Sequence, residues 1–178
     1  MDRNLGATRV ATSSFDFDSY GSLYQWGRGS DGHQKITFPT TATLSTGDVP
    51  GHANFITTNS SPYDWRSPQK DNLWQGVNGV NNPCPAGYRI PTQTELNAEI
   101  LIFQKKRADG AFASVLKLPL GGYRNKYNGS VDYGGMFGQY WTSTVSGSDS
   151  VLLFFYNNNM YFMTVSRGFG NSVRCLKN

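Results

Sequence analysis

Apolar side chains recur at the spacing of one helical face in the middle of the chain, with polar residues between them. The three that repeat on this face are Leu96, Ile100 and Phe103. Thr92 and Glu95 have the spacing of a capping box, in which each side chain bonds the backbone N–H of the other residue. Gly110 supplies the glycine that commonly follows a helix. The pattern predicts a helix from about residue 93 to residue 107.

A second, shorter run of helical spacing lies near the start of the chain. Its large side chains fall at positions i, i+3, i+4 and i+6: Tyr20, Leu23, Tyr24 and Trp26. We expect a short helix there that packs one face inward. The following segment, residues 37–82, has no sustained period, but it contains Trp65 and Trp74. Those two indoles predict that this irregular segment folds down onto a core.

The last third of the chain consists of aromatic and β-branched runs divided by turns rich in glycine, serine and asparagine. Such runs are typical of strands. They cover residues 114–125, 139–145, 150–158, 159–167 and 171–178. We therefore expect a small twisted antiparallel sheet in this part. A helix followed by such a sheet, with long irregular loops, predicts an α+β fold.

Composition narrows the class of protein further. With 178 residues and 38% hydrophobic content, the chain suits a single domain over residues 1–178. Charged residues are few, at 16%, and the 14% aromatic content with 20 glycines favours a loop-rich fold over a helical bundle. Tyrosine, tryptophan, asparagine, serine and glycine also form adaptable binding surfaces, because an aromatic side chain gives contact area at low entropic cost.

The charge pattern gives little support to a nucleic-acid partner. The net charge is +4, and the basic residues are scattered except for the triplet at residues 105–107. We interpret the triplet as a solvated helix end, where cations are favoured by the helix dipole. A nucleic-acid patch is the weaker alternative.

Membrane insertion has no signal in this sequence. No apolar run approaches the roughly 20 residues of a membrane span, and the N-terminus lacks the pattern of a signal peptide. The opening MDRNLGATRV reads like the middle of a longer polypeptide. We therefore expect any export signal, anchor, or upstream display or assembly module to lie outside this chain.

The two cysteines, Cys84 and Cys175, are far apart, and neither belongs to a C-x-x-C pair. A zinc or redox site therefore has little support. A disulfide between them and a pair of buried thiols both stay open, since the choice depends on the compartment.

Catalytic chemistry has little support either. His33 and His52 lie in polar loops, and the sequence contains no G-x-S-x-G, H-E-x-x-H or phosphate-binding glycine motif. Asp16 and Asp18 form a D-x-D, but two carboxylates are too few for a metal site. We expect no enzyme activity, no cofactor and no metal. A catalytic alternative would need a metal or substrate in the loop of Asp16, Asp18 and His33.

Six short motifs point to a family. In chain order they are MDRNLGAT, YGSLYQWGR, CPAGYRIPTQTEL, LPLGGYRN, YWTST and the closing RGFGNSVRC. Together they resemble the Fibrobacter succinogenes major paralogous domain, over nearly the whole chain. That domain belongs with the C-type lectin fold, in a branch that includes formylglycine-generating-enzyme-like proteins. The resemblance implies two helices, a small C-terminal antiparallel sheet and much irregular backbone.

Two departures limit what the resemblance implies. The tripeptides E-P-N, Q-P-D and W-N-D, on which calcium-dependent sugar binding rests in C-type lectins, are absent. The closely placed reactive cysteine pair of the formylglycine-generating relatives is also absent. Neither calcium-dependent sugar binding nor oxidase activity is carried over to this chain.

The resemblance implies a binding function. Domains of this type serve as the variable proteins of diversity-generating retroelements, in which adenine-directed mutagenesis alters side chains on one exposed face. The variable region would be residues 140–175, and the partner a cell-surface protein or glycan receptor. The location would be extracellular, on a cell surface or on a phage virion. The alternative is a non-diversified bacterial surface or lipoprotein domain with a structural or adhesive role.

The resemblance also assigns individual side chains. It directs Leu153 and Phe155 toward the core and Phe154 to the opposite side. Phe169 lies beside the candidate ligand-binding positions, and Asn171 replaces a phenylalanine of the family pattern. Asn171 marks either another variable position or a change in local packing. The remaining candidate ligand-binding residues are Tyr156, Asn157, Asn158, Asn159, Tyr161, Met163 and Val165.

Each of these features has a plainer interpretation. The three asparagines could simply form a hairpin turn, because asparagine tolerates left-handed backbone angles. Residues 121–138, rich in glycine, tyrosine and asparagine, could rim the same face as the hairpin. For that loop we prefer the interpretation of an ordinary long connection.

Overall fold

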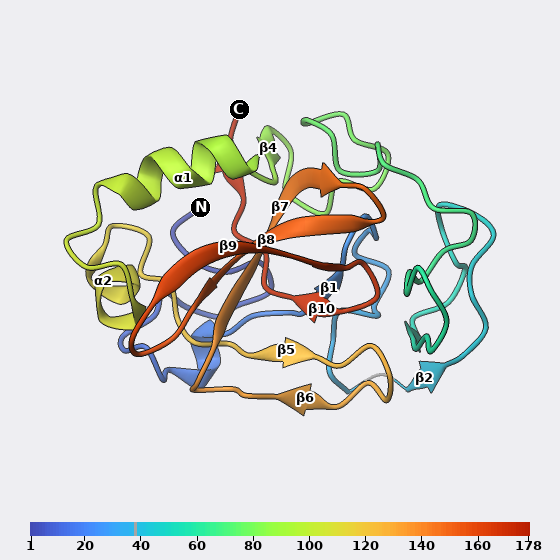
Figure 1. Cartoon of the computed structure of the whole chain (residues 1–178), viewed down its shortest axis with the longest axis horizontal. Helices are drawn as coiled ribbons and strands as arrows, with labels where there is room; N and C mark the ends of the chain where they lie inside the picture. Colours follow the sequence, from blue (N-terminus) through green and yellow to red (C-terminus); the bar gives the residue numbers. More distant parts are fainter. Residues whose placement is uncertain (38) are drawn as a thin grey trace.

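Figure 1 shows the computed structural model, which describes residues 1–37 and 39–178. Its two helices, α1 (Gln93–Leu101) and α2 (Ala108–Ala113), lie on the same side of a three-stranded sheet. Small sheets and long irregular loops make up much of the remainder. The chain therefore has the predicted α+β character, with two helices.

The capping box forms as its spacing predicts. Thr92 Oγ1 accepts a hydrogen bond from the Glu95 backbone N–H at 3.2 Å. Glu95 Oε2 accepts one from the Thr92 backbone N–H at 2.9 Å, so two N–H groups that a helix start leaves free are satisfied. α1 then buries Leu96 and Ile100, and the predicted start of the helix is confirmed.

The predicted end of this helix is wrong. α1 ends at Leu101, not near residue 107, and Gly110 lies inside α2. Phe103 keeps the burial that its spacing predicted, although it lies beyond the helix. Beyond the helix, Lys106 Nζ donates to the carbonyls of Ile100 and Phe103. Such contacts from a residue beyond the helix are not visible in a periodic pattern.

The central sheet consists of three antiparallel strands in the order β7-β8-β9. They are β7 (Gly138–Ser146), β8 (Asp149–Phe155) and β9 (Met160–Ser166). The strands predicted over residues 139–145, 150–158 and 159–167 are thus confirmed, with slightly different bounds. The pairing of β7 with β8 shifts register between Trp141 and Val145, which marks a bulge.

The remaining strands have only two residues each: β1 (Tyr24–Gln25), β2 (Thr40–Thr41), β3 (Phe55–Ile56), β4 (Tyr88–Arg89), β5 (Tyr123–Arg124), β6 (Val131–Asp132), β10 (Gly170–Asn171) and β11 (Leu176–Lys177). A four-stranded antiparallel sheet has the order β1-β10-β5-β6. The other pairs are β4 with β11, antiparallel, and β2 with β3, parallel. The long strands predicted over residues 114–125 and 171–178 therefore shrink to short pieces.

The short helix predicted around Tyr20 and Trp26 is also wrong. A 3-10 turn, η1 (Phe17–Ser19), precedes this stretch, and Tyr24 pairs with Asn171 as part of β1. Leu23, Tyr24 and Trp26 are nevertheless buried, so the apolar pattern identified inward-facing side chains but not their backbone.

Two apolar cores lie on opposite sides of the central sheet, and β8 contributes side chains to both cores. Leu153 and Phe155 join the core beneath α1 and α2, as predicted. Leu152 packs with Trp141 and Trp26 in the second core. This alternation follows from the two-residue period of a strand.

The irregular segment is tied down by buried side chains that donate to backbone carbonyls. Trp65 Nε1 donates to the Trp26 carbonyl at 2.7 Å, and Trp74 Nε1 donates to the Asn81 carbonyl at 3.1 Å. Trp26 Nε1 in turn donates to the carbonyl of Thr142 on β7 at 2.9 Å. Trp65 and Trp74 are buried, which confirms that this segment folds onto a core.

Cys84 and Cys175 form a disulfide, with their Cα atoms 5.9 Å apart. The bond links the end of the irregular segment to the chain just before β11. Among the residues that the structure describes, none belongs to a helix with the length and apolar character needed to cross a membrane.

Candidate ligand-binding face

The hairpin of β8 and β9 carries most of the predicted ligand-binding residues. The two strands pair in register, with Phe154 opposite Tyr161 and Leu152 opposite Met163. The Tyr156 backbone N–H donates to the Asn159 carbonyl at 3.0 Å and closes the tip. Side chains that alternate with Leu153 and Phe155 therefore share the other face of this hairpin, where Leu152 is buried and Phe154 and Tyr156 are half-buried.

The three asparagines of the tip are exposed: Asn157, Asn158 and Asn159. Asn159 Oδ1 accepts a hydrogen bond from the Met160 backbone N–H at 2.8 Å. None of the three has a positive φ; in the described chain, non-glycine residues with positive φ are Tyr63, Lys117 and Tyr133. The asparagines do lie in the turn between β8 and β9, as the plainer interpretation predicts, but the backbone angles of this turn do not demand asparagine.

Six aromatic side chains form an unbroken series of ring contacts across the hairpin and the neighbouring small sheet. We call this series the aromatic row: Tyr161, Phe154, Phe137, Tyr133, Tyr123 and Phe169. Successive ring centroids lie 5.3, 5.1, 4.6, 5.8 and 5.5 Å apart in that order. Such separations are those of favourable aromatic pairs, so each ring is held by its neighbours.

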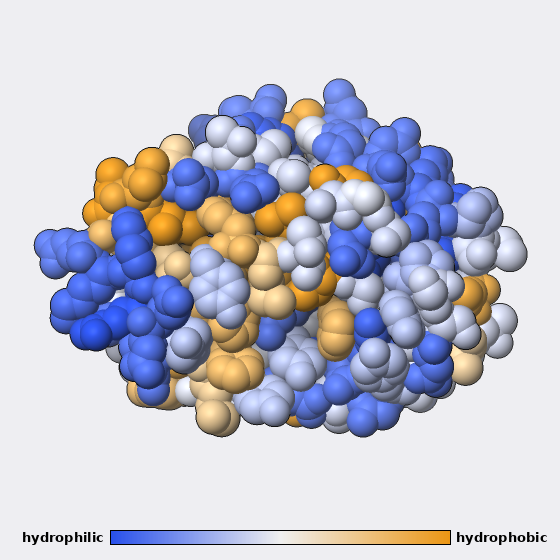
Figure 2. Space-filling view, in the orientation of Figure 1, coloured by the Kyte–Doolittle hydropathy of each residue, from blue (hydrophilic) through white to orange (hydrophobic). Residues whose placement is uncertain are grey.

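The row is partly accessible to solvent. Tyr161 is 44% exposed and Tyr133 is 48% exposed, whereas the other four rings are half-buried. Tyr156 extends the row at the hairpin tip, with its ring 5.7 Å from that of Phe154. In Figure 2, pale and orange side chains cover the middle of the visible face, in front of β5, β8 and β9, between strongly hydrophilic areas.

The loop of residues 121–138 is more than a connection. It supplies Tyr123, Tyr133 and Phe137 to the row, and Phe137 bridges to Phe154 on β8. The preference for an ordinary connection was therefore wrong, because this loop does rim the same face. Its tyrosine and glycine content was the signal in the sequence, but the partner rings lie on other strands.

A lysine ammonium group lies at the Phe169 end of the row. Lys126 Nζ is 4.9 Å from the Phe169 ring centroid, 3.8 Å from that of Tyr63 and 4.9 Å from that of Tyr127. It also donates to Ser166 Oγ at 2.8 Å. Burial lowers the pKa of Lys126, while the charge of Asp149 opposes that shift. Rings around a cation attract it through their π faces, which fixes this end of the row.

Met163 and Val165 point to the same side of β9 as Tyr161, as strand alternation requires. Both are half-buried, because they pack against the core that contains Trp141 and Leu152. They offer less surface than the hairpin tip, but they continue the same face along the strand.

Asn171 differs from the other candidates because its side chain has no exposed surface. Its 0% exposure follows from the position of β10 between β1 and β5. Its Oδ1 and Nδ2 atoms have no hydrogen-bond partner within the described part of the chain. The expectation that Asn171 could lie on the exposed face is therefore wrong for this structure.

The residues of the catalytic alternative do not converge. Asp16 and Asp18 both pair with Arg9, at 2.8 and 3.2 Å. His33 is fully buried, and its Nδ1 lies 2.6 Å from Asp31 Oδ1. Across residues 1–37 and 39–178, no group of three or more His, Cys, Asp or Glu side chains is placed to hold a metal ion.

Comparison of the chain with protein-family models, with curated proteins and with solved structures finds no match.

Proposed function

We propose that this chain is a non-catalytic ligand-binding domain that recognises a protein or glycan receptor through the aromatic row and the hairpin tip. The observation that carries the proposal is the row itself, a partly exposed series of mutually packed rings beside three exposed asparagines. Rigid aromatic side chains supply contact area at low entropic cost, and amides choose among hydrogen-bonding partners. A few such anchors carry most of the binding energy in typical interfaces.

The finer proposal is a C-type-lectin-like domain that serves as the variable protein of a diversity-generating retroelement. The motif order supports it, and so does the separation between the exposed tip and the buried side chains beneath it. The frame beneath the tip is held by backbone pairing and two cores, so exposed side chains can change without loss of the fold.

An extracellular location, at a cell surface or on a phage virion, forms part of this proposal. The disulfide between Cys84 and Cys175 supports it, because disulfides persist mainly in oxidising compartments.

Population sequencing of the gene tests the variable-protein proposal. We expect substitutions at codons 140–175 to follow the adenines of a neighbouring template copy and to change Tyr156, Tyr161 and the tip asparagines. Codons for the buried Leu153 and Phe155 should stay constant and serve as the internal control. Sparse substitutions spread evenly over the gene would contradict the proposal.

A fixed adhesion domain is the second candidate, and one observation favours it. Tyr123, Tyr133 and Phe137 belong to the aromatic row but lie outside residues 140–175. If only residues 140–175 vary, half of the aromatic row stays constant, which suits ligands that share a constant part. If no residue of the row varies, the face suits a single ligand, as in a fixed adhesion domain. The same sequencing experiment separates these two functions.

A further inference from the structure

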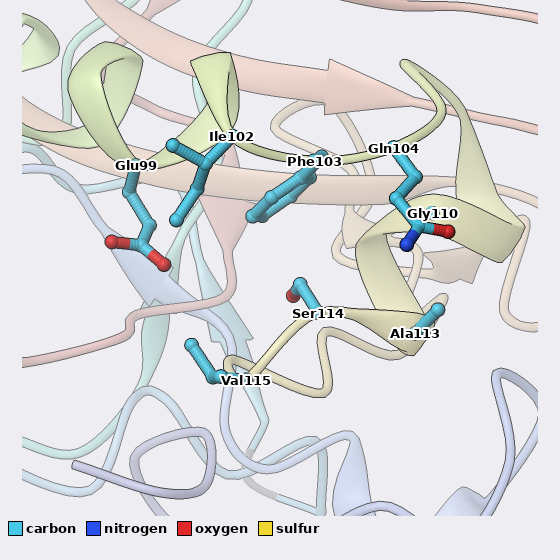
Figure 3. Close-up of a pocket in the computed structure, with 8 residues that line it drawn as sticks. All are labelled: Glu99, Ile102, Phe103, Gln104, Gly110, Ala113, Ser114 and Val115. Atoms are coloured by element: carbon cyan, nitrogen blue, oxygen red, sulfur yellow. The ribbon is translucent and has the colours of Figure 1, made fainter.

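A hollow of about 250 Å³ lies between α1 and α2, apart from the aromatic row. Figure 3 shows the side chains of Ile102 and Phe103 on one side, Ser114 and Val115 on the other, and the Glu99 carboxylate near one end. The walls are mostly apolar, whereas the end is acidic. A site of this kind selects ligands that have an apolar body and one polar group.

Glu99 is the unusual member of this group. Its Oε1 atom is buried and has no hydrogen-bond partner among the described residues. The neighbouring carboxylates differ: Glu95 pairs with Arg89 at 2.5 Å, and Asp109 pairs with Arg107 at 2.8 Å. A buried carboxylate oxygen without a donor is costly, because it has lost water and gained no partner.

The position of Glu99 along α1 adds a second cost. Glu99 lies in the last turn of the helix, and that turn carries no basic side chain. The C-terminal end of a helix has partial negative charge, so a carboxylate there is repelled and a cation is attracted. A bound cation would offset both costs at once.

The mouth of the hollow is apolar and open to solvent. Ile102 is 72% exposed and Val115 is 81% exposed, and both line the hollow. Single exposed aliphatic side chains are common. Here two of them flank an acidic end. This arrangement suits a ligand whose methylene groups lie along the apolar walls and whose positive charge lies at Glu99.

From these observations we propose that the hollow binds the side chain of a lysine from a partner protein. A primary ammonium group on an unbranched aliphatic stem matches the apolar walls and the Glu99 carboxylate, for which the structure records no side-chain partner. This site is independent of the aromatic row and of the function proposed for it.

The basic side chains nearby do not fill the hollow. Lys106 Nζ donates to the carbonyls of Ile100 and Phe103. Lys105 and Arg107 both pair with Asp109. Their charges reduce the attraction for an incoming cation at long range, whereas the contact with Glu99 acts at short range.

Titration with small probes tests the proposal directly. The probes are Nα-acetyl-lysine methylamide and, as its uncharged analogue, Nα-acetyl-norleucine methylamide. We expect saturable shifts of the Ile102, Ser114 and Val115 amide resonances with the lysine probe, and no saturable shift with the norleucine probe. No saturable shift with the lysine probe at its highest soluble concentration would overturn the proposal.

Two variants with equal net charge separate the site from general electrostatics. Glu99→Gln should weaken binding of the lysine probe by about tenfold or more, since it removes the charged acceptor. Asp109→Asn should leave the affinity within about twofold, because a change at the surface acts only through screened charge. Equal losses in the two variants would overturn the assignment to Glu99. A third probe, n-butylamine, should bind more weakly than the lysine probe; equal affinity would overturn the assignment to a partner protein's lysine.

Stability provides a readout that needs no probe. If the unpartnered Glu99 carboxylate destabilises the folded protein in the absence of ligand, the Glu99→Gln variant without probe should melt at the same temperature as the parent protein or higher. The lysine probe should raise the melting temperature of the parent more than that of the variant. A variant that melts lower without probe would mean that Glu99 serves the fold, and the proposal would fail.

Discussion

The central sheet and the irregular segment are held together by different kinds of hydrogen bond. The term irregular segment here covers residues 26–82, since residues 26–36 contain no helix or strand either. In β7, β8 and β9, the strands pair through their own backbones over most of their length. In the irregular segment, buried side chains donate to carbonyls that no strand partner reaches. Arg28 alone bonds the carbonyls of His52 and Asn54 as well as the Asp31 carboxylate.

The difference determines where the chain tolerates change. Backbone pairing does not depend on which side chain projects from an exposed strand position, so the hairpin face can vary while the strands stay paired. A buried donor such as Arg28 or Trp65 is matched to particular carbonyls, and few replacements could satisfy them. The irregular segment therefore depends on its residue identities more than the sheet does.

The most severe test of this comparison removes a buried donor. Arg28→Met retains a long side chain but leaves the Oδ2 atom of Asp31 and two carbonyls without the donor that Arg28 supplies. We expect the free energy of unfolding in urea to fall by about 3–5 kcal/mol. The matched change on the sheet, Tyr161→Ala, should cost about 1 kcal/mol or less, since that side chain is 44% exposed. Similar losses in the two variants would contradict the comparison.

Breaking the disulfide should have the next largest effect, because it ties the chain just after the irregular segment to the C-terminal part of the chain. Replacing both Cys84 and Cys175 by alanine increases the number of conformations available to the unfolded chain, which stabilises the unfolded state. We expect a loss of about 2–4 kcal/mol in the free energy of unfolding. A reductant added to the parent protein should lower its urea midpoint toward that of the double variant. A parent midpoint that matches the double variant without reductant would mean that the bond does not form.

Acid should weaken the irregular segment before the sheet. His33 Nε2 accepts the Gln25 backbone N–H at 3.0 Å, which leaves the ring proton on Nδ1 beside Asp31. Burial lowers the pKa of His33 to about 4, although Asp31 opposes that shift. The unfolded chain binds a proton near pH 6.5 and the folded chain only near pH 4. This contribution to stability is therefore present above pH 6.5 and is lost as the pH falls toward 4.

The loss attributable to His33 should be on the order of 2–3 kcal/mol between pH 6.5 and pH 4. Urea unfolding of the parent protein and of His33→Gln across that range would measure it. We expect the variant to be less stable at neutral pH, with a flatter dependence on pH between 6.5 and 5. Parallel pH profiles for the two proteins would rule out this role for His33.

The smallest effect should come from the hairpin tip. Asn157 and Asn158 are exposed and do not have positive φ, so their replacement by alanine removes no bond that the structure records for their side chains. We expect the double variant to unfold within about 0.5 kcal/mol of the parent. A larger loss would show that the asparagines are needed for the turn, and would weaken the case for recognition.

The sequence predicted best those parts of the fold whose contacts join residues close together in the chain. The contacts of Thr92 and Glu95 lie within one helical turn, so their spacing was enough to find the start of α1. The strands of the hairpin pair with their nearest neighbours in the chain, and their alternation was readable as well. Burial was predicted better than backbone shape, as Phe103 and Tyr24 illustrate.

Contacts between distant parts of the chain account for the errors. Tyr24 belongs to a strand because Asn171 pairs with it, and the same pairing buries Asn171. Phe137 joins the aromatic row through Phe154, which lies on another strand. Half of the proposed face could therefore be predicted from the hairpin, while the rings from residues 121–138 required a three-dimensional arrangement.

The disulfide also has a mechanical consequence. A stretching force between residues 1 and 178 would run along residues 1–84, cross from Cys84 to Cys175 and leave through the last few residues. Residues 85–174, which include both helices and the whole aromatic row, lie outside this covalent path. Tension on the two ends of the chain could draw out the early irregular segment but would not pull directly on the hairpin. The hairpin therefore bears no direct covalent load while the disulfide is intact, and tension would reach it only through packing and pairing with residues 1–84, such as β1 with β10.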